Sequence, residues 1–283
     1  MTDISSIPED AAQLPKQAVP APGAGRWAAF VTAVQFLTRV PLSTGGCVSA
    51  ATLAGCPVYF PVVGVLIGVF TSCVLGVACL IWPLWLAVIG ALAAEALLTG
   101  AFHEDAAADF CDAFGGGWTR EDTLTILKDS RLGTYGALGL GLGVALRAGA
   151  IIEIIHRQGL ENWLVWGSAL VASSAVGRWV IVLVMVRVPP VPRRESLSRD
   201  TGSQLNRWDL LAATLWTLPA AVWLAVQLPQ HAALAVALLV PTIFGFMRWV
   251  VRRLGGITGD CLGCIGFVAQ LLVLLAAAAR WQP

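Results

Sequence analysis

Seven long apolar stretches constrain the fold of this 283-residue chain more than any other feature. A helix needs about 20 mostly apolar residues to cross the hydrocarbon core of a bilayer, so each stretch predicts one membrane-spanning helix. The composition agrees, because only 12% of the residues are charged, against about 25% in an ordinary soluble domain. We therefore predict an all-α, polytopic integral membrane helix bundle with about seven spans. The stretches cover residues 58–81, 83–102, 133–155, 163–187, 209–228, 232–250 and 261–279.

The segments outside these stretches complete the predicted organisation. Residues 27–40 are apolar but too short to span, which predicts an interfacial or re-entrant helix. Residues 1–25 are rich in Pro and Ala and lack the features of a signal peptide, so we expect a disordered cytoplasmic tail before one membrane-embedded domain, 26–283. Cys261 and Cys264 form a lone C-x-x-C without a nearby His or second pair, which favours packing over zinc or redox chemistry.

Lysine and arginine are distributed unevenly between the connecting segments. With the N-terminus inside, segments 1–57, 103–132, 188–208 and 251–260 are cytoplasmic and carry most of this charge, whereas the outer segments carry Arg157 and Arg280. The positive-inside rule therefore predicts a multi-pass protein of the cell (inner) membrane with its N-terminus in and its C-terminus out. The net charge is +1 and no basic stripe exists, so the expected partner is the lipid bilayer and not nucleic acid.

The segment after the second stretch carries a row of carboxylates. Asp105, Asp109 and Asp112 follow at i, i+4 and i+7, which places them on one face of a helix. Such a row favours a bound Mg²⁺ or Mn²⁺, especially where substrate phosphates complete the ligand shell. The alternative is a solvated acidic loop, but the flanking residues are mostly Ala, Phe and Cys. His103 is a candidate base, ligand or phosphate donor, or else an interfacial His, and Glu104 lies on a different face.

Two further segments on the predicted cytoplasmic side combine polar groups with glycine. Lys128-Asp129-Ser130-Arg131 precedes Gly133 and has the charge and hydroxyl groups to hold phosphate, although a positive-inside flank explains the cations equally well. Residues 255–263 form a Gly-rich turn with one carboxylate, Asp260. Glycine permits a close approach of backbone to ligand. We predict that Asp260 completes the cation site, the alternative being a helix N-cap.

Two arginines, Arg147 and Arg178, fall within apolar stretches. Charge inside a membrane is costly and faces a cavity, a ligand or a partner. Ion pairs with Glu95 or Glu153 are therefore one interpretation for each arginine, and contact with substrate is the other.

Together these segments resemble the cobalamin synthase family (adenosylcobinamide-GDP ribazoletransferase). The family patterns His-Leu-Asp-Gly-Leu-Ala-Asp-Thr-x-Asp-Gly, Lys/Arg-Asp-Ser-Arg-x-Gly-Thr and Gly-Gly-x-Thr-Gly-Asp-x-Leu-Gly are similar to residues 103–113, 128–134 and 255–263. Residues 36–41 and 59–64 also resemble its N-terminal segments, so the likeness runs in order from about residue 27 to about residue 275. The chain departs from the pattern at Glu104, Ala106, Ala113 and Gln270.

The resemblance implies an enzyme that joins α-ribazole, or its 5′-phosphate, to adenosylcobinamide-GDP with release of GMP. It implies Mg²⁺ as cofactor, and it leaves open a homo-oligomer or association with other corrinoid-pathway enzymes. A CDP-alcohol type phosphotransferase is an alternative, but its motif order is missing, and a transporter would place carboxylates at mid-membrane. The implied site residues are His103 as catalytic group, Asp105, Asp109, Asp112 and Asp260 as metal ligands, and Arg39, Lys128, Asp129, Ser130, Arg131, Arg178, Thr258 and Gly259 as substrate-binding residues.

Overall fold

The computed structural model describes residues 24–42, 50–191 and 205–280, and nearly all of the predicted N-terminal tail lies outside them. Every regular element in this part of the chain is a helix, and an isolated bridge joins Pro190 to Ile257. The elements are α1 (Ala24–Leu37), α2 (Ala50–Gly55), η2 (Cys56–Tyr59), α3 (Phe60–Ala78), α4 (Leu84–Thr99), α5 (Phe102–Gly116), α6 (Arg120–Ile126), α7 (Thr134–Gln158), α8 (Trp163–Arg187), α10 (Arg207–Gln227), α11 (Pro229–Leu254) and α12 (Gly259–Ala278).

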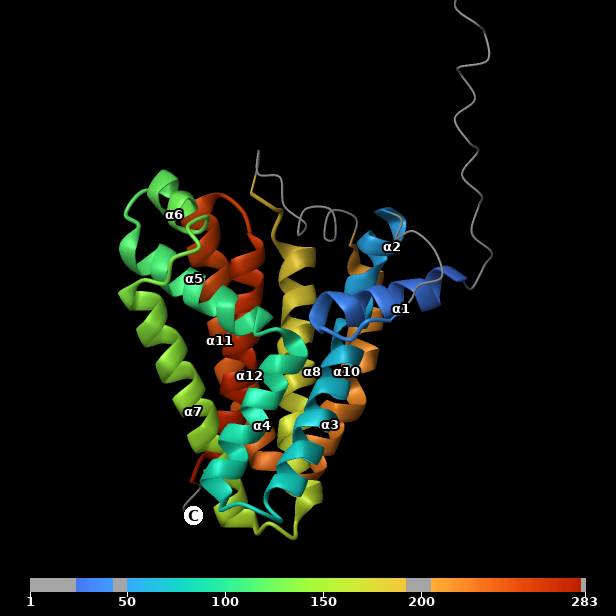
Figure 1. Cartoon of the computed structure of the whole chain (residues 1–283). Coiled ribbons are helices and arrows are strands. Elements are labelled where there is room, and N and C mark those ends of the chain that lie inside the picture. The colour runs from blue at the N-terminus through green and yellow to red at the C-terminus, as the bar shows by residue number, and fades with distance from the viewer. Residues whose placement is uncertain (1–23, 43–49, 192–204, 281–283) are drawn as a thin grey trace, which may run out of the picture.

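The predicted membrane bundle is confirmed. Six helices are long and apolar enough to span a membrane, and α4 with α5 forms a seventh, bent pair. Two of the six, α8 and α12, lie at the centre and are far more buried than the outer helices α10 and α11. The short helix α1 runs across the long helices on the same half of the molecule as α5 and α6, away from the C-terminal end of α12 (Figure 1).

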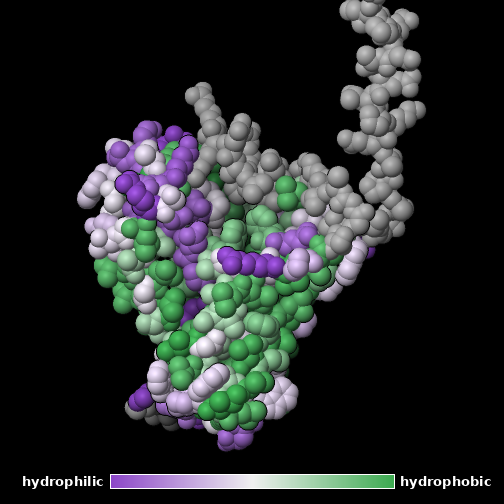
Figure 2. Space-filling model, viewed as in Figure 1, coloured by the Kyte–Doolittle hydropathy of each residue, from purple (hydrophilic) through white to green (hydrophobic). Residues whose placement is uncertain are grey.

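Polar and apolar surface are separated along the bundle. Polar side chains gather over α5 and α6, above a broad apolar girdle formed by the long helices (Figure 2). The girdle includes large exposed side chains such as Leu97, Leu142, Val226 and Phe244. Surface of this kind is stable against acyl chains, so the polar end is where water-soluble substrates can reach the protein.

The second predicted span, 83–102, is wrong in one respect. Helix α4 ends at Thr99, and α5 continues at 90° to it. Two consecutive residues with left-handed backbone, Gly100 (φ 70°) and Ala101 (φ 55°), break the helix. The 16 residues of α4 rise about 24 Å at 1.5 Å per residue, less than the roughly 30 Å hydrocarbon core. The chain therefore bends before α4 has crossed the whole hydrocarbon core, and α5 with its carboxylates runs at 90° to α4.

Gly100 is expected to be needed at this bend. A Cβ at residue 100 would lie 2.6 Å from Nε of Arg39, and its φ is +70°. Gly100→Ala should therefore lower the free energy of unfolding by at least about 1 kcal/mol, the cost of a left-handed backbone for an L-residue. Gly90→Ala in α4 is the control, because a Cβ there meets nothing within 4 Å. Unfolding in mixed micelles measures both, and equal stability of the two variants would contradict the expectation.

Candidate active site

Helix α5 carries the predicted row of carboxylates. Asp105 is exposed, and Asp109 and Asp112 are half-buried. The opposite face of the helix packs into the bundle through His103, Ala106, Ala107, Ala108, Phe110 and Ala113. The helix ends at Gly116, so the run of glycines at 115–117 stops it as expected from the sequence. The i, i+4, i+7 spacing thus gives one acidic stripe on the outer face of a helix at the polar end of the molecule.

Asp260 lies beside this stripe. Its negative charge acts on Asp109 together with the charges of Asp105 and Asp112. Helices α5 and α12 pack so closely that a Cβ at Gly263 would collide with the Cβ of Ala106. Asp260 is not the N-cap of α12, since that position is held by Thr258, whose hydroxyl accepts from the backbone N–H of Cys261 over 3.3 Å. The capping interpretation of Asp260 is therefore wrong.

Asp112, which the sequence predicted as a metal ligand, accepts hydrogen bonds from the start of α7. Its Oδ2 accepts from the backbone N–H of Gly133 over 2.7 Å, and its Oδ1 accepts from that of Gly136 over 2.8 Å. A carboxylate at this place satisfies N–H groups that have no partner within the helix. Asp112 thereby fastens the segment before α7 to the acidic helix.

We expect this contact to be intolerant of a side chain at residue 136. A Cβ on Gly136 would collide with Oδ2 of Asp112. Gly136→Ala should separate α7 from α5 and lower the unfolding midpoint temperature. Gly141→Ala in the same helix, where a Cβ meets nothing within 4 Å, should leave the midpoint unchanged or raise it, since Ala is about 1 kcal/mol the better helix former. A Gly136→Ala midpoint as high as that of the control would show that the contact does not hold the two helices.

The segment before α7 borders a cleft that reaches Asp112. The cleft has a volume of about 500 Å³ and is lined by Asp129, Arg131, Thr134 and Tyr135, among others. Arg131 pairs with Asp129 over 2.6 Å, and hydrogen bonds from the Arg131 side chain lower the pKa of Asp129 to about 2. Lys128 and Ser130 are exposed next to this pair. Asp129 and Arg131 of the predicted phosphate segment thus line the same open cleft as Asp112, the last carboxylate of the acidic stripe.

The Gly-rich turn is held at the same end by contacts from distant segments. Nε of Arg120 donates to the carbonyl of Leu254 over 2.9 Å, and Arg253 donates to the carbonyl of Gly117. The backbone N–H of Ile257 donates to the carbonyl of Pro189 over 2.9 Å. These bonds connect residues up to 136 positions apart. Together with the position of Asp260 beside Asp109, the bonds of the adjoining Arg253 and Leu254 confirm the prediction that segments 103–132 and 255–260 meet.

The sequence model of one protein family matches residues 29–278 of this chain, and its description is cobalamin-5-phosphate synthase. The chain belongs to this family. An adenosylcobinamide-GDP ribazoletransferase of Leptothrix cholodnii is 38% identical over 256 residues, which cover 89% of this chain and 94% of the relative. The enzymes of that name from Leptospira interrogans and Shewanella frigidimarina are 31% and 36% identical and cover 90% and 87% of this chain, with 97% and 94% of their own length matched. No solved structure matches the chain.

Membership of the cobalamin-5-phosphate synthase family confirms the resemblance found in the sequence motifs. It decides against the two alternatives, a CDP-alcohol type phosphotransferase and a transporter. The match covers all the spanning helices, the acidic stripe of α5 and Asp260.

Three of the residues predicted to act in catalysis or binding are buried. His103, Arg178 and Thr258 are each 2% exposed. Neither ring nitrogen of His103 has a hydrogen-bond partner in the described part of the chain. Arg178 donates from Nη1 to Oε1 of Gln270 over 2.7 Å, and not to Glu95 or Glu153, the carboxylates that the sequence offered as one of two interpretations. These residues lie beneath the open site and not on its surface.

Arg39 and Gly259 lie closer to the surface of the same end. Arg39 is exposed, its backbone N–H donates to the carbonyl of Leu98 over 2.7 Å, and its guanidinium lies against Gly100 at the bend. Gly259 begins α12 and lines a small apolar pocket with Phe36, Phe60 and Phe102. Arg39 therefore places one positive charge at the junction of α4 and α5.

The oxygen donors of this family member fit a divalent cation of the Mg²⁺ type. Within the described residues no three His, Cys, Asp or Glu side chains converge on one metal position. Mg²⁺ is held in many enzymes by only one or two carboxylates, with water and substrate phosphates as the other ligands. The half-buried pair Asp109 and Asp260, with exposed Asp105 nearby, supplies that kind of donor set.

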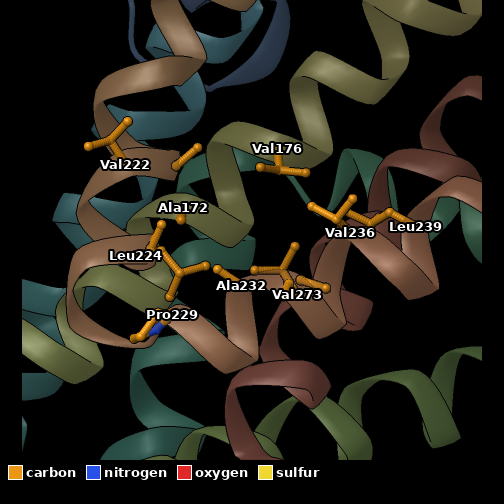
Figure 3. A pocket seen from close by; sticks show the side chains of 13 residues that line it. Ala172, Val176, Val222, Leu224, Pro229, Ala232, Val236, Leu239 and Val273 are labelled. Atoms are coloured by element: carbon orange, nitrogen blue, oxygen red, sulfur yellow. The ribbon is translucent and has the colours of Figure 1, made fainter.

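A second large cavity of the molecule has no such chemistry. It has a volume of about 430 Å³ and lies between α8, α10, α11 and α12. Its lining is entirely aliphatic, and Ala172, Val176, Val236 and Val273 point into it (Figure 3). A cavity without a polar group cannot orient a diphosphate, so this cavity is not a candidate for the substrate site.

Proposed function

We propose that this chain transfers α-ribazole, or α-ribazole 5′-phosphate, onto adenosylcobinamide-GDP and releases GMP. The product is adenosylcobalamin or its 5′-phosphate, formed in the last steps of cobalamin biosynthesis. Family membership and the names of relatives over 87% or more of the chain support this activity. The single structural observation that supports it most is the meeting of Asp260 with the acidic stripe of α5 beside the Lys128–Arg131 segment.

In this reaction a ribose hydroxyl attacks the phosphorus atom next to the cobinamide side. The bond from that phosphorus to the oxygen that stays with GMP breaks, and the hydroxyl proton passes to solvent. We propose that Asp109 and Asp260, with Asp105 nearby, would hold Mg²⁺, which would neutralise the diphosphate. Lys128 and Arg131 attract the phosphates by charge, and the exposed Ser130 hydroxyl donates to a phosphate oxygen. The open cleft at Tyr135 leaves room for a large polar substrate.

Incubation of the purified protein with both substrates tests the proposal directly. Adenosylcobinamide-GDP, α-ribazole 5′-phosphate and Mg²⁺ should yield GMP and a cobalamin 5′-phosphate in equal amounts, measured by chromatography. Omission of either substrate is the control. GMP without a new corrinoid would indicate a hydrolase, and neither product from folded protein would contradict the proposal.

We also propose that the site faces the cytoplasm. The lysines and arginines of the connecting segments support this orientation by the positive-inside rule. A membrane-impermeant thiol reagent, applied to intact cells, should not label Trp118→Cys but should label Glu161→Cys, on a background without native cysteines. Residue 118 is 84% exposed at the polar end, and Glu161 is exposed between α7 and α8 at the other end. Labelling of residue 118 from outside would contradict the proposed orientation and place the site on the outer face of the membrane.

A further inference from the structure

A chain of buried charges crosses the bend between α4 and α5. Arg147 of α7 donates from Nη2 to Oε1 of Glu95 in α4 over 2.8 Å, and from Nη1 to Oε1 of Glu104 in α5 over 3.2 Å. The side chains of Arg147 and Glu95 are 3% and 4% exposed, and that of Glu104 is 14% exposed. Because the two carboxylates lie on opposite sides of the bend, Arg147 ties the two helices together.

The chain of contacts continues into the centre of the bundle. Gln270 of α12 donates from Nε2 to Oε1 of Glu95 over 3.3 Å and accepts from Arg178 of α8 over 2.7 Å. Thr71 of α3 donates to Oε2 of Glu95 over 2.9 Å. We call this set the buried network. Its members are Thr71, Glu95, Glu104, Arg147, Arg178 and Gln270.

The buried network carries no net charge, because its two guanidinium groups, Arg147 and Arg178, are matched in number by the carboxylates of Glu95 and Glu104. Removal of one member of a buried ion pair leaves an uncompensated charge, which is strongly destabilising. Charge within membrane helices carries the same penalty. Gln270 contacts both Glu95 and Arg178, so a carboxylate at residue 270 would enter the same network. Neutrality therefore requires two carboxylates but not necessarily one at residue 104.

The same contacts determine where the acidic stripe lies. Glu104 fastens the first turn of α5 to α7, and Asp112 fastens the end of α5 to the start of α7. Asp105 follows Glu104 directly, and Asp109 lies one turn further on. A change in the angle at the bend would move both carboxylates away from Asp260.

We propose that Glu104 is a positioning residue whose carboxylate, through Arg147 and Glu95, keeps the buried network neutral and sets the bend that brings Asp105 and Asp109 to Asp260. In Glu104→Gln the amide oxygen still accepts from Arg147, but the network lacks one negative charge. Gln270→Glu restores that charge, because residue 270 contacts both Glu95 and Arg178. The effect on catalysis rests on the proposed function, whereas the effect on the bend does not.

Distances across the bend test the structural half of the proposal. Spin labels on Leu97→Cys in α4 and Trp118→Cys after α5 occupy exposed positions, 70% and 84%, in a protein whose native cysteines are replaced. Pulsed electron paramagnetic resonance should give one narrow distance distribution for the parent protein. Glu104→Gln should broaden or shift it, and Glu104→Gln with Gln270→Glu should restore it. The matched control is Glu161→Gln, an exposed carboxylate at the opposite end.

Turnover tests the catalytic half. Glu104→Gln should lower turnover by about 10-fold to 100-fold and raise the Mg²⁺ concentration for half-maximal rate, as the loss of a group that orients ligands does. The double variant should recover most of this loss. An unchanged distance and rate in Glu104→Gln would overturn the proposal, as would a double variant no better than the single one. If Glu104→Gln does not fold, recovery of folded double variant supports the proposal and failure of both overturns it. A parent protein that releases no GMP would instead contradict the proposed function and leave the distance result standing.

Discussion

Asp105→Asn and Asp109→Asn are each expected to lower GMP release by about 100-fold to 1,000-fold, the loss seen when a group that stabilises charge in the transition state is removed. Asparagine preserves the volume of aspartate but removes the negative charge that a hard cation requires. The two residues lie one turn apart on the outer face of α5, and the charge of Asp105 acts on Asp109. Either substitution therefore weakens the same cation site.

The control for these variants is Glu121→Gln in α6. Glu121 is 78% exposed and pairs with its neighbour Arg120 at the same polar end, so its charge contributes to the local field but not to the acidic stripe. Turnover of Glu121→Gln should stay within about 2-fold of the parent protein, because exposed ion pairs are worth at most about 1 kcal/mol and are often without effect. Near-normal turnover in both aspartate variants would show that α5 does not hold the cation.

Asp260→Asn and Asp260→Ser are expected to fold normally and to lose about 100-fold or more of turnover. The residual activity should need more Mg²⁺, because the carboxylate from α12 no longer meets the carboxylates of α5. These variants should be less destabilised than one that lacks the N-cap, since the cap of α12 is the hydroxyl of Thr258. Thr258→Ala should show the opposite result in an unfolding experiment, a loss of about 1 kcal/mol, the usual cost of a missing N-cap.

Comparison of the Asp260 variants with Thr258→Ala distinguishes a carboxylate that acts in turnover from one that only stabilises the helix. Thermal unfolding and Mg²⁺ titration of GMP release measure them side by side. If Asp260→Asn is as destabilised as Thr258→Ala and keeps the parent Mg²⁺ dependence, Asp260 supports the helix and the cation site belongs to α5 alone.

The long helices could be predicted because each corresponds to one continuous run of apolar residues. The run of residues 163–187 became α8 with the same bounds, and the acidic spacing gave a helix with one acidic face. Such features depend on local composition and period, which the sequence contains directly. The convergence of the Gly-rich turn with α5 followed from topology, since both segments had to lie at one end.

The bend could not be predicted because it depends on tertiary contacts. Nothing in residues 83–102 except Gly100 indicates a break, and an isolated glycine is tolerated within a membrane helix. What holds the turn is the pairing of Arg147 with Glu95 and Glu104 and the position of Arg39 against Gly100. Glu95 and Glu104 come to one guanidinium only after the helix has bent, so their spacing in the sequence could not reveal the pairing.

Two departures from the family pattern meet in the buried network. These are Glu104, to which the sequence analysis gave no function, and Gln270. The structure places the extra carboxylate against Arg147 and the amide against Arg178. Only the three-dimensional arrangement shows that these two positions, which are far apart in the sequence, share one network of contacts.

We propose that the stripe on α5 and Asp260 form a cation-dependent site for ribazole transfer. The most direct test is GMP release by the purified protein with both substrates present, before and after removal of divalent cations by a chelator. We expect release to stop in the chelator and to return as Mg²⁺ is added in excess, with a higher half-saturating concentration for Asp260→Asn than for the parent protein. Full release in the presence of the chelator would contradict the account.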